Sequence, residues 1–88
     1  WKKEFVYAEG PFTPDVNGDV TFILPVAMPS DVYLVNITLR RFSGTVTNIT
    51  YQVTAQTASN FTVNFRVGDT GAALTTGTYV MYYKIEEF

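Results

Sequence analysis

The side chains best suited to chemistry in this sequence are Arg66 and Asp69, which stand where an alternating segment runs into a glycine-rich stretch. A guanidinium donates several directional hydrogen bonds, and a carboxylate accepts hydrogen bonds from hydroxyl groups. With an aromatic ring such as Tyr82 or Trp1 to stack on the apolar face of a sugar, these residue types are typical of a carbohydrate-binding site. The alternative places the charged residues on a solvated face or in an ion pair between subunits, and the aromatic residues in the core or an interface.

Groups that perform catalysis are scarce, because the chain contains no histidine and no cysteine. Ser30, Ser43 and Ser59 therefore have no imidazole to act as their base. The acidic residues stand near the chain ends or in turns, and no pattern puts two of them in an apolar cleft. We expect no enzymatic activity, no cofactor, and no zinc, copper or haem site.

The segment 15–19 carries oxygen ligands at alternate positions, like the start of a calcium-binding EF-hand loop. The match then fails, because Val20 stands where that loop needs glycine and Val26 where it needs a bidentate glutamate. The other interpretation is a type I′ hairpin turn at Asn17-Gly18, which explains the glycine without a metal. We therefore predict a turn and no metal site.

Size and charge narrow the classes of partner. The chain has 88 residues, six basic and eight acidic side chains, and a net charge of −2, and its sequence pI is about 4.8. A nucleic-acid-binding domain usually has a basic stripe and a pI above about 9. No segment approaches the roughly 20 apolar residues that a membrane-spanning helix needs. We expect neither nucleic acid nor membrane as a partner.

Period-2 alternation of apolar and polar residues dominates the chain and predicts half-buried β-strands. We expect Gly10-Pro11 to end the first strand, an antiparallel hairpin in the middle of the chain, and a surface loop over residues 68–77. The sequence therefore predicts an all-β, antiparallel β-sandwich of about six strands, with no significant helix, as a single domain over residues 1–88. The predicted strands are residues 3–8, 20–24, 32–41, 47–57, 60–67 and 78–86.

The last predicted strand departs from clean alternation, because both of its faces carry bulky apolar residues. Tyr79, Met81 and Tyr83 share one face, while Val80 and Tyr82 share the other. A strand that is apolar on both faces is usually buried on both faces. In so small a sandwich one face meets the core, so we expect the other to meet a second copy of the chain.

Several strand patterns resemble the small β-sandwich modules at the tips of bacteriophage tail fibres and spikes, and their order is similar to that of H-type lectins. The patterns are a strand ending in proline, a turn into a long strand, an x-Phe-Thr-Val strand and an aromatic last strand; they are residues 20–25, 30–35, 59–63 and 77–85. The resemblance implies a homotrimer that binds host-surface sugars or other receptors. The chain departs from H-type lectins in having no histidine and in having its one tryptophan at Trp1, so no sugar-binding residue is carried over.

Together these observations predict a non-catalytic module of a phage or virus particle that binds a host-surface receptor, with carbohydrate as the expected ligand. Arg66, Asp69, Tyr82 and Trp1 are the candidate binding residues. The chain begins at Trp1 without a methionine, and we expect it to be part of a longer protein, located on a virion or otherwise extracellular. Two alternatives stay open: a structural module that contacts other virion proteins, in capsid decoration or tail assembly, and a carbohydrate-binding module cut from a larger enzyme.

Overall fold

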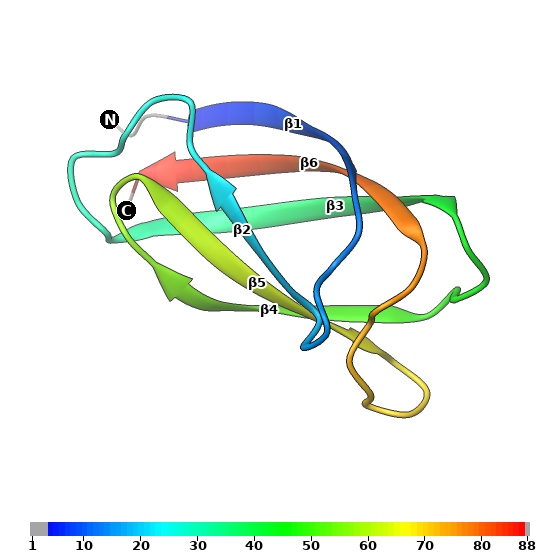
Figure 1. The fold of residues 1–88 in the computed structure, drawn as a ribbon. Coiled ribbons are helices and arrows are strands. Elements are labelled where there is room, and N and C mark those ends of the chain that lie inside the picture. Colours follow the sequence, from blue (N-terminus) through cyan, green and yellow to red (C-terminus); the bar gives the residue numbers. More distant parts are fainter. Residues whose placement is uncertain (1–3, 88) are drawn as a thin grey trace.

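The computed structural model describes residues 4–87, and in this range it consists of six β-strands without a helix (Figure 1). The strands form two three-stranded antiparallel sheets in two facing layers, a β-sandwich-like fold. We call the sheet of order β1-β6-β3 sheet A and the sheet of order β2-β5-β4 sheet B. The strands are β1 (Glu4–Phe12), β2 (Asp19–Ile23), β3 (Tyr33–Ser43), β4 (Ile49–Gln56), β5 (Asn60–Val67) and β6 (Thr78–Glu87). The predicted all-β, six-stranded antiparallel architecture is confirmed.

β1 is longer than the sequence predicts, because the Gly10-Pro11 pair lies inside the strand and does not end it. β1 pairs with β6 as far as Phe12, and the register shifts between Glu9 and Phe12. A register shift of this kind allows a strand to contain a proline, because proline has no N–H group to donate to the neighbouring strand. The expectation that Gly10-Pro11 breaks the strand was therefore wrong.

The turn at Asn17-Gly18 is also different from the predicted hairpin. It joins β1 to β2, and these strands lie in different sheets and do not pair. Gly18 has a positive φ of 79°, whereas no residue other than glycine has a positive φ among those described, which excludes a type I′ turn at this pair. The segment instead carries the chain from sheet A to sheet B.

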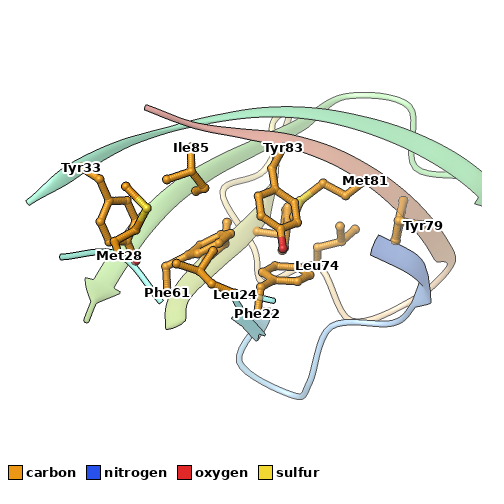
Figure 2. Packing of buried hydrophobic residues seen from close by; sticks show 12 residues of the cluster. Phe22, Leu24, Met28, Tyr33, Phe61, Leu74, Tyr79, Met81, Tyr83 and Ile85 are labelled. Carbon is orange, nitrogen blue, oxygen red and sulfur yellow. The ribbon is translucent and has the colours of Figure 1, made fainter. Parts of the chain in front are cut away.

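The predicted central hairpin is confirmed: β4 and β5 pair antiparallel, with Tyr51 opposite Phe65 and Val53 opposite Val63. β5 and β6 are the central strands of their sheets, and most of their inward side chains are fully buried. Figure 2 shows the inward residues of β6 pointing toward those of sheet B. The buried core consists of Phe22, Leu24, Met28, Tyr33, Phe61, Val63, Phe65, Leu74, Tyr79, Met81, Tyr83 and Ile85.

Leu74 is a core residue that the sequence places in a surface loop. It lies in the segment between β5 and β6, yet only 1% of its surface is exposed. The Leu74 amide donates to the carbonyl oxygen of Phe65 at 3.1 Å, and the Val67 amide donates to that of Ala72 at 2.8 Å. Residues 72–74 thus extend sheet B along β5 beyond the start of β2, and this pairing directs the Leu74 side chain into the core (Figure 2).

Side chains join the two sheets where β3 faces β4. The amide nitrogen Nε2 of Gln56 donates to the carbonyl oxygens of Asp31 at 2.7 Å and Tyr33 at 2.9 Å. The Tyr51 hydroxyl donates to the carbonyl oxygen of Ile37 at 3.3 Å. These bonds connect strands that share no backbone ladder, so this side of the sandwich is held by hydrogen bonds as well as by packing.

Shortening Leu74 tests its role in the core. We expect Leu74→Ala to lower the free energy of unfolding by about 2–5 kcal/mol, because it leaves a cavity that the surrounding residues cannot fill. For a domain of this size that loss lowers Tm by about 10 °C or more. The matched control is Leu34→Ala, since Leu34 is 47% exposed on β3. Thermal unfolding followed by circular dichroism measures both variants in dilute solution, and equal effects would contradict the assignment.

The core tyrosine Tyr83 makes stability depend on alkaline pH. Burial raises the pKa of Tyr83 from 10.0 to about 12, and the Glu9 carboxylate adds to the rise. Between these values the unfolded chain loses the Tyr83 proton while the folded chain keeps it. The free energy of unfolding therefore falls as pH rises through this window, by at most about 1.4 kcal/mol per pH unit from this group.

We expect Tyr83→Phe to lose less stability than the unmodified chain between about pH 9.5 and pH 11.5. Urea unfolding at these two pH values gives the difference. Tyr82→Phe is the control, because the neighbouring Tyr82 ring is 57% exposed on the opposite face of β6. If the two variants lose equal stability over this window, Tyr83 is not the group responsible.

Candidate functional site

The four residues predicted to bind ligand do not converge on one surface. Arg66 lies near the end of β5, and Asp69 lies just beyond it in the β5–β6 loop. Tyr82 lies on β6, in the other sheet. Arg66 and Tyr82 both alternate with buried neighbours, Phe65 and Tyr83 among them, so their side chains point away from the core on opposite sides of the sandwich. Trp1 is outside the described residues.

Arg66 is the centre of a hydrogen-bond network on the outer face of sheet B. Its Nε donates to Asn64 Oδ1 at 2.8 Å, and its Nη1 donates to the carbonyl oxygen of Gly71 at 3.2 Å. Asn64 Nδ2 in turn donates to the carbonyl oxygen of Asn17 at 2.9 Å and to Asp19 Oδ1 at 2.7 Å. We call these five residues the Arg66 network. They fix an exposed guanidinium in one orientation.

Asp69 lies at the same end of the molecule but has a different partner. Its Oδ1 accepts a hydrogen bond from Asn48 Nδ2 at 3.0 Å, and the Gly68 amide donates to the Asn48 carbonyl oxygen at 2.8 Å. Among residues 4–87 the ion pair that forms is Lys84 with Glu4, at 3.3 Å. The chain thus places Arg66 and Asp69 near each other along the sequence without pairing their charges.

Three loops meet at this end of the sandwich, beside the Arg66 network: residues 13–18, 44–48 and 68–77 (Figure 1). The Phe65 amide donates to the Gly18 carbonyl oxygen at 2.7 Å. Gly18 is required there, since a Cβ at this position would overlap the carbonyl oxygen of Phe65 and its φ of +79° disfavours other residues. The close approach of the first loop to β5 therefore brings Asn17 and Asp19 to Asn64.

Sequence reasoning missed Asn17, Asn48 and Asn64 as members of this surface. Of these, only Asn64 could have been predicted from the sequence, because it precedes Arg66 by two residues and so lies on the same face of the strand. The bond from Asn64 to Asn17 spans 47 residues and that from Asn48 to Asp69 spans 21, and no pattern in the sequence joins these partners. Asp15, considered above as a metal ligand, accepts hydrogen bonds from the amides of Asn17 and Asp19 at 2.8 and 2.9 Å, as in an Asx turn.

The outer faces of the two sheets differ in chemistry. Outward residues of sheet B are mostly polar, and Thr21 and Thr62 form a hydrogen bond across β2 and β5 at 2.9 Å. The outer face of sheet A exposes Val6 and Tyr82, and a shallow hollow of about 260 Å³ lies there between β1, β6 and β3. Beside the β3–β4 loop a second open hollow of about 350 Å³ is lined by Leu39, Arg41, Val46, Thr47 and Ile49.

Comparisons with known proteins find no match among protein-family models, curated proteins or solved structures. Within residues 4–87 there is also no helix long and apolar enough to cross a membrane, and no group of three or more acidic side chains placed to hold a metal ion. The geometry of the site is therefore the basis for a functional interpretation.

Removing the amide of Asn64 tests whether the Arg66 network is an integral part of the fold. We expect Asn64→Ala to lower the free energy of unfolding by about 1–3 kcal/mol, because Arg66, Asp19 and the Asn17 carbonyl all lose a partner. Asn36→Ala is the matched control: Asn36 lies on the outer face of β3 and makes no side-chain hydrogen bond to the described residues. Urea unfolding of both variants gives the comparison, and equal values would mean that the network adds nothing to stability.

Proposed function

We propose that this chain is a non-catalytic recognition module that binds a hydroxyl-rich ligand, a cell-surface carbohydrate, at the Arg66 network. The observation that carries the proposal is that the Arg66 guanidinium is only partly hydrogen-bonded within the chain. Two of its five N–H groups are bound within the chain, to Asn64 and Gly71. Its other donors make no hydrogen bond to residues 4–87, and the side chain is exposed. Its orientation is already fixed by the two bonds, which lowers the entropy cost of binding a ligand.

The surroundings of Arg66 suit a ligand with many hydroxyl groups. Asp69 and Asn48 stand beside the same end of β5 and offer oxygen acceptors, while the neighbouring face of sheet B presents threonine hydroxyls. A sugar hydroxyl both donates and accepts, so it matches a surface that mixes donors and acceptors. The absence of histidine and cysteine from the chain supports binding over catalysis.

The site offers hydrogen bonds without the stacking ring that the sequence suggested, since Tyr82 lies on the other face of the sandwich. Hydrogen bonds to an exposed surface replace bonds to water and give a small net gain. We therefore expect weak binding by each copy, with a Kd of about 1 mM, and a functional affinity raised by multivalent display. A homo-oligomer on a particle provides such display.

The biological setting that we propose, the tip of a phage tail fibre or spike with host-surface glycan as receptor, is supported by the resemblance of the strand patterns in residues 20–25 and 77–85.

A second function, a structural virion module that contacts other virion proteins, is favoured by one observation. The outer face of sheet A exposes Val6, Leu34 and Tyr82 together, and apolar surface of this kind commonly contacts another protein.

The binding proposal is tested with an array of cell-surface glycans, followed by NMR titration with any glycan that binds. We expect Arg66→Ala to weaken binding by about 10- to 100-fold, the contribution of one or two hydrogen bonds from a charged donor. The matched control is Arg41→Gln, because Arg41 lies outside the network and donates to the Val46 carbonyl oxygen at 3.1 Å. We expect this control to bind as the unmodified chain does.

Two results would contradict carbohydrate binding at this site. One is that the chain binds no glycan on the array but does bind purified virion proteins, which supports the structural function. The other is glycan binding that Arg66→Ala leaves unchanged, which places the ligand elsewhere on the molecule.

A further inference from the structure

The outer face of sheet A has an ordered pattern of side chains that becomes clear when the strand registers are combined. Residues that pair across β1, β6 and β3 form successive rows along the strands. Row one carries two acidic side chains and row four one basic side chain. Rows two and three mix apolar and neutral polar side chains with a single lysine. The rows are Glu4–Glu86–Leu34, Val6–Lys84–Asn36, Ala8–Tyr82–Thr38 and Val80–Arg40.

Large apolar side chains on this face are open to solvent. Val6 is 69% exposed, Tyr82 57% and Leu34 47%, although each lies in a strand of a folded sheet. The face is that of the layer formed by β1, β6 and β3 in Figure 1. An exposed apolar sheet face of this kind is suited to packing against a second sheet.

The charges on the face are separated along the strands. Glu4 in row one is neutralised by Lys84 at 3.3 Å. Glu86 in the same row and Arg40 in row four have no ion-pair partner among residues 4–87. Within the range 4–87, one end of the face therefore carries a negative charge without an ion-pair partner, and the other a positive charge without one.

The geometry points to a second copy of this chain as the partner of this face, packed sheet A against sheet A about a two-fold axis that runs across the strands between rows two and three. This arrangement reverses the strand direction, so row one of one copy meets row four of the other. Arg40 then lies over Leu34 of the second copy and within one strand of its Glu86. Tyr82 lies over the partner's Lys84, a favourable cation–π geometry, and the apolar Val6 lies over the partner's Ala8.

The alternative two-fold axis, parallel to the strands, is disfavoured by the same charges. It would keep each row opposite itself, so Glu86 would face Glu86 and Lys84 would face Lys84. Like charges that face each other across an interface are destabilising. A face that meets its own copy gives a two-fold interface, not a three-fold one, so this inference differs from the homotrimer implied by the sequence resemblance. It does not depend on the carbohydrate site, which lies on the other sheet.

The expected dimer is weak. Strand spacing and rise give a face of about 14 Å by 20–25 Å, and the flat footprint of about 300 Å² is well below the roughly 800 Å² per partner of a standard interface. We therefore expect a Kd of about 100 µM, so association is measured between about 5 and 500 µM protein by sedimentation velocity and light scattering.

Charge reversal tests the orientation directly. We expect Arg40→Glu and Glu86→Arg each to weaken the dimer at least 10-fold, because each places like charges in contact at two symmetric positions. The double variant R40E/E86R restores opposite charges at both positions, and we expect it to recover the affinity to within about threefold. Thr50→Glu adds a negative charge to the outer face of sheet B and is the control expected to leave association unchanged.

Rescue by the double variant is specific to the two-fold arrangement across the strands. A chain that stays monomeric at 500 µM, or that sediments as a trimer, would overturn the proposal. So would a dimer in which the double variant associates no better than the single variants. Circular dichroism on each variant confirms that the fold is retained, since all three positions are on outer faces of the sheets.

Discussion

The contact between Phe61 and Tyr83 is the interaction on which the rest of the structure depends, because it joins the central strands of the two sheets. The rings meet edge to face, with centroids 5.2 Å apart and planes at 70°, a geometry favoured by the aromatic quadrupole. Phe22 packs against both rings, at 5.4 Å from Phe61 and 6.3 Å from Tyr83. In a chain without disulfides, this aromatic layer is what holds the two sheets face to face.

The same contact determines which side chains are exposed on the outer faces of the two sheets. Once Phe61 and Tyr83 point inward, alternation directs Asn64 and Arg66 outward from β5, and Tyr82 outward from β6. The chemistry of each surface then follows from the residues at the outward positions. Sheet B presents hydrogen-bonding groups in a fixed arrangement, whereas sheet A presents apolar groups between opposite charges. Packing in the core and recognition at the surface are therefore two results of one alternation pattern.

Much of this fold could be predicted from the sequence, because period-2 alternation reports which side of a strand is buried. It correctly gave six strands and the central hairpin, but it did not show which of the two apolar faces of β6 points into the core. Alternation does not report which sheet a strand joins, and this explains the error at Asn17-Gly18, where a turn signal marks a crossing between sheets. Leu74 was missed for a related reason: a single buried leucine in a glycine- and threonine-rich segment has no periodic neighbours.

The candidate site was predictable only in part. Arg66 lies near the end of one strand and Asp69 just beyond it, so the sequence predicts that both lie at the same end of the sheet. Asn64 shares a strand face with Arg66. The hydrogen bonds to Asn17 and between Asp69 and Asn48 depend on three loops meeting at one end of the sandwich. That meeting is a property of topology, since loops that follow alternate strands gather at the same end. The placement of Tyr82 on the opposite face follows from topology as well.

The side chains that join β3 to β4 have a consequence for how the protein behaves at high concentration. An edge strand with free carbonyl and amide groups can recruit another strand, and repeated recruitment leads to fibrils. Gln56 occupies the carbonyl oxygens of Asp31 and Tyr33, and Tyr51 occupies that of Ile37. The longest edge of the molecule is thereby made a poor template for an incoming strand. In a chain built almost entirely of strands, the β3 edge is thereby protected against sheet growth from one copy into the next, even when copies are packed densely.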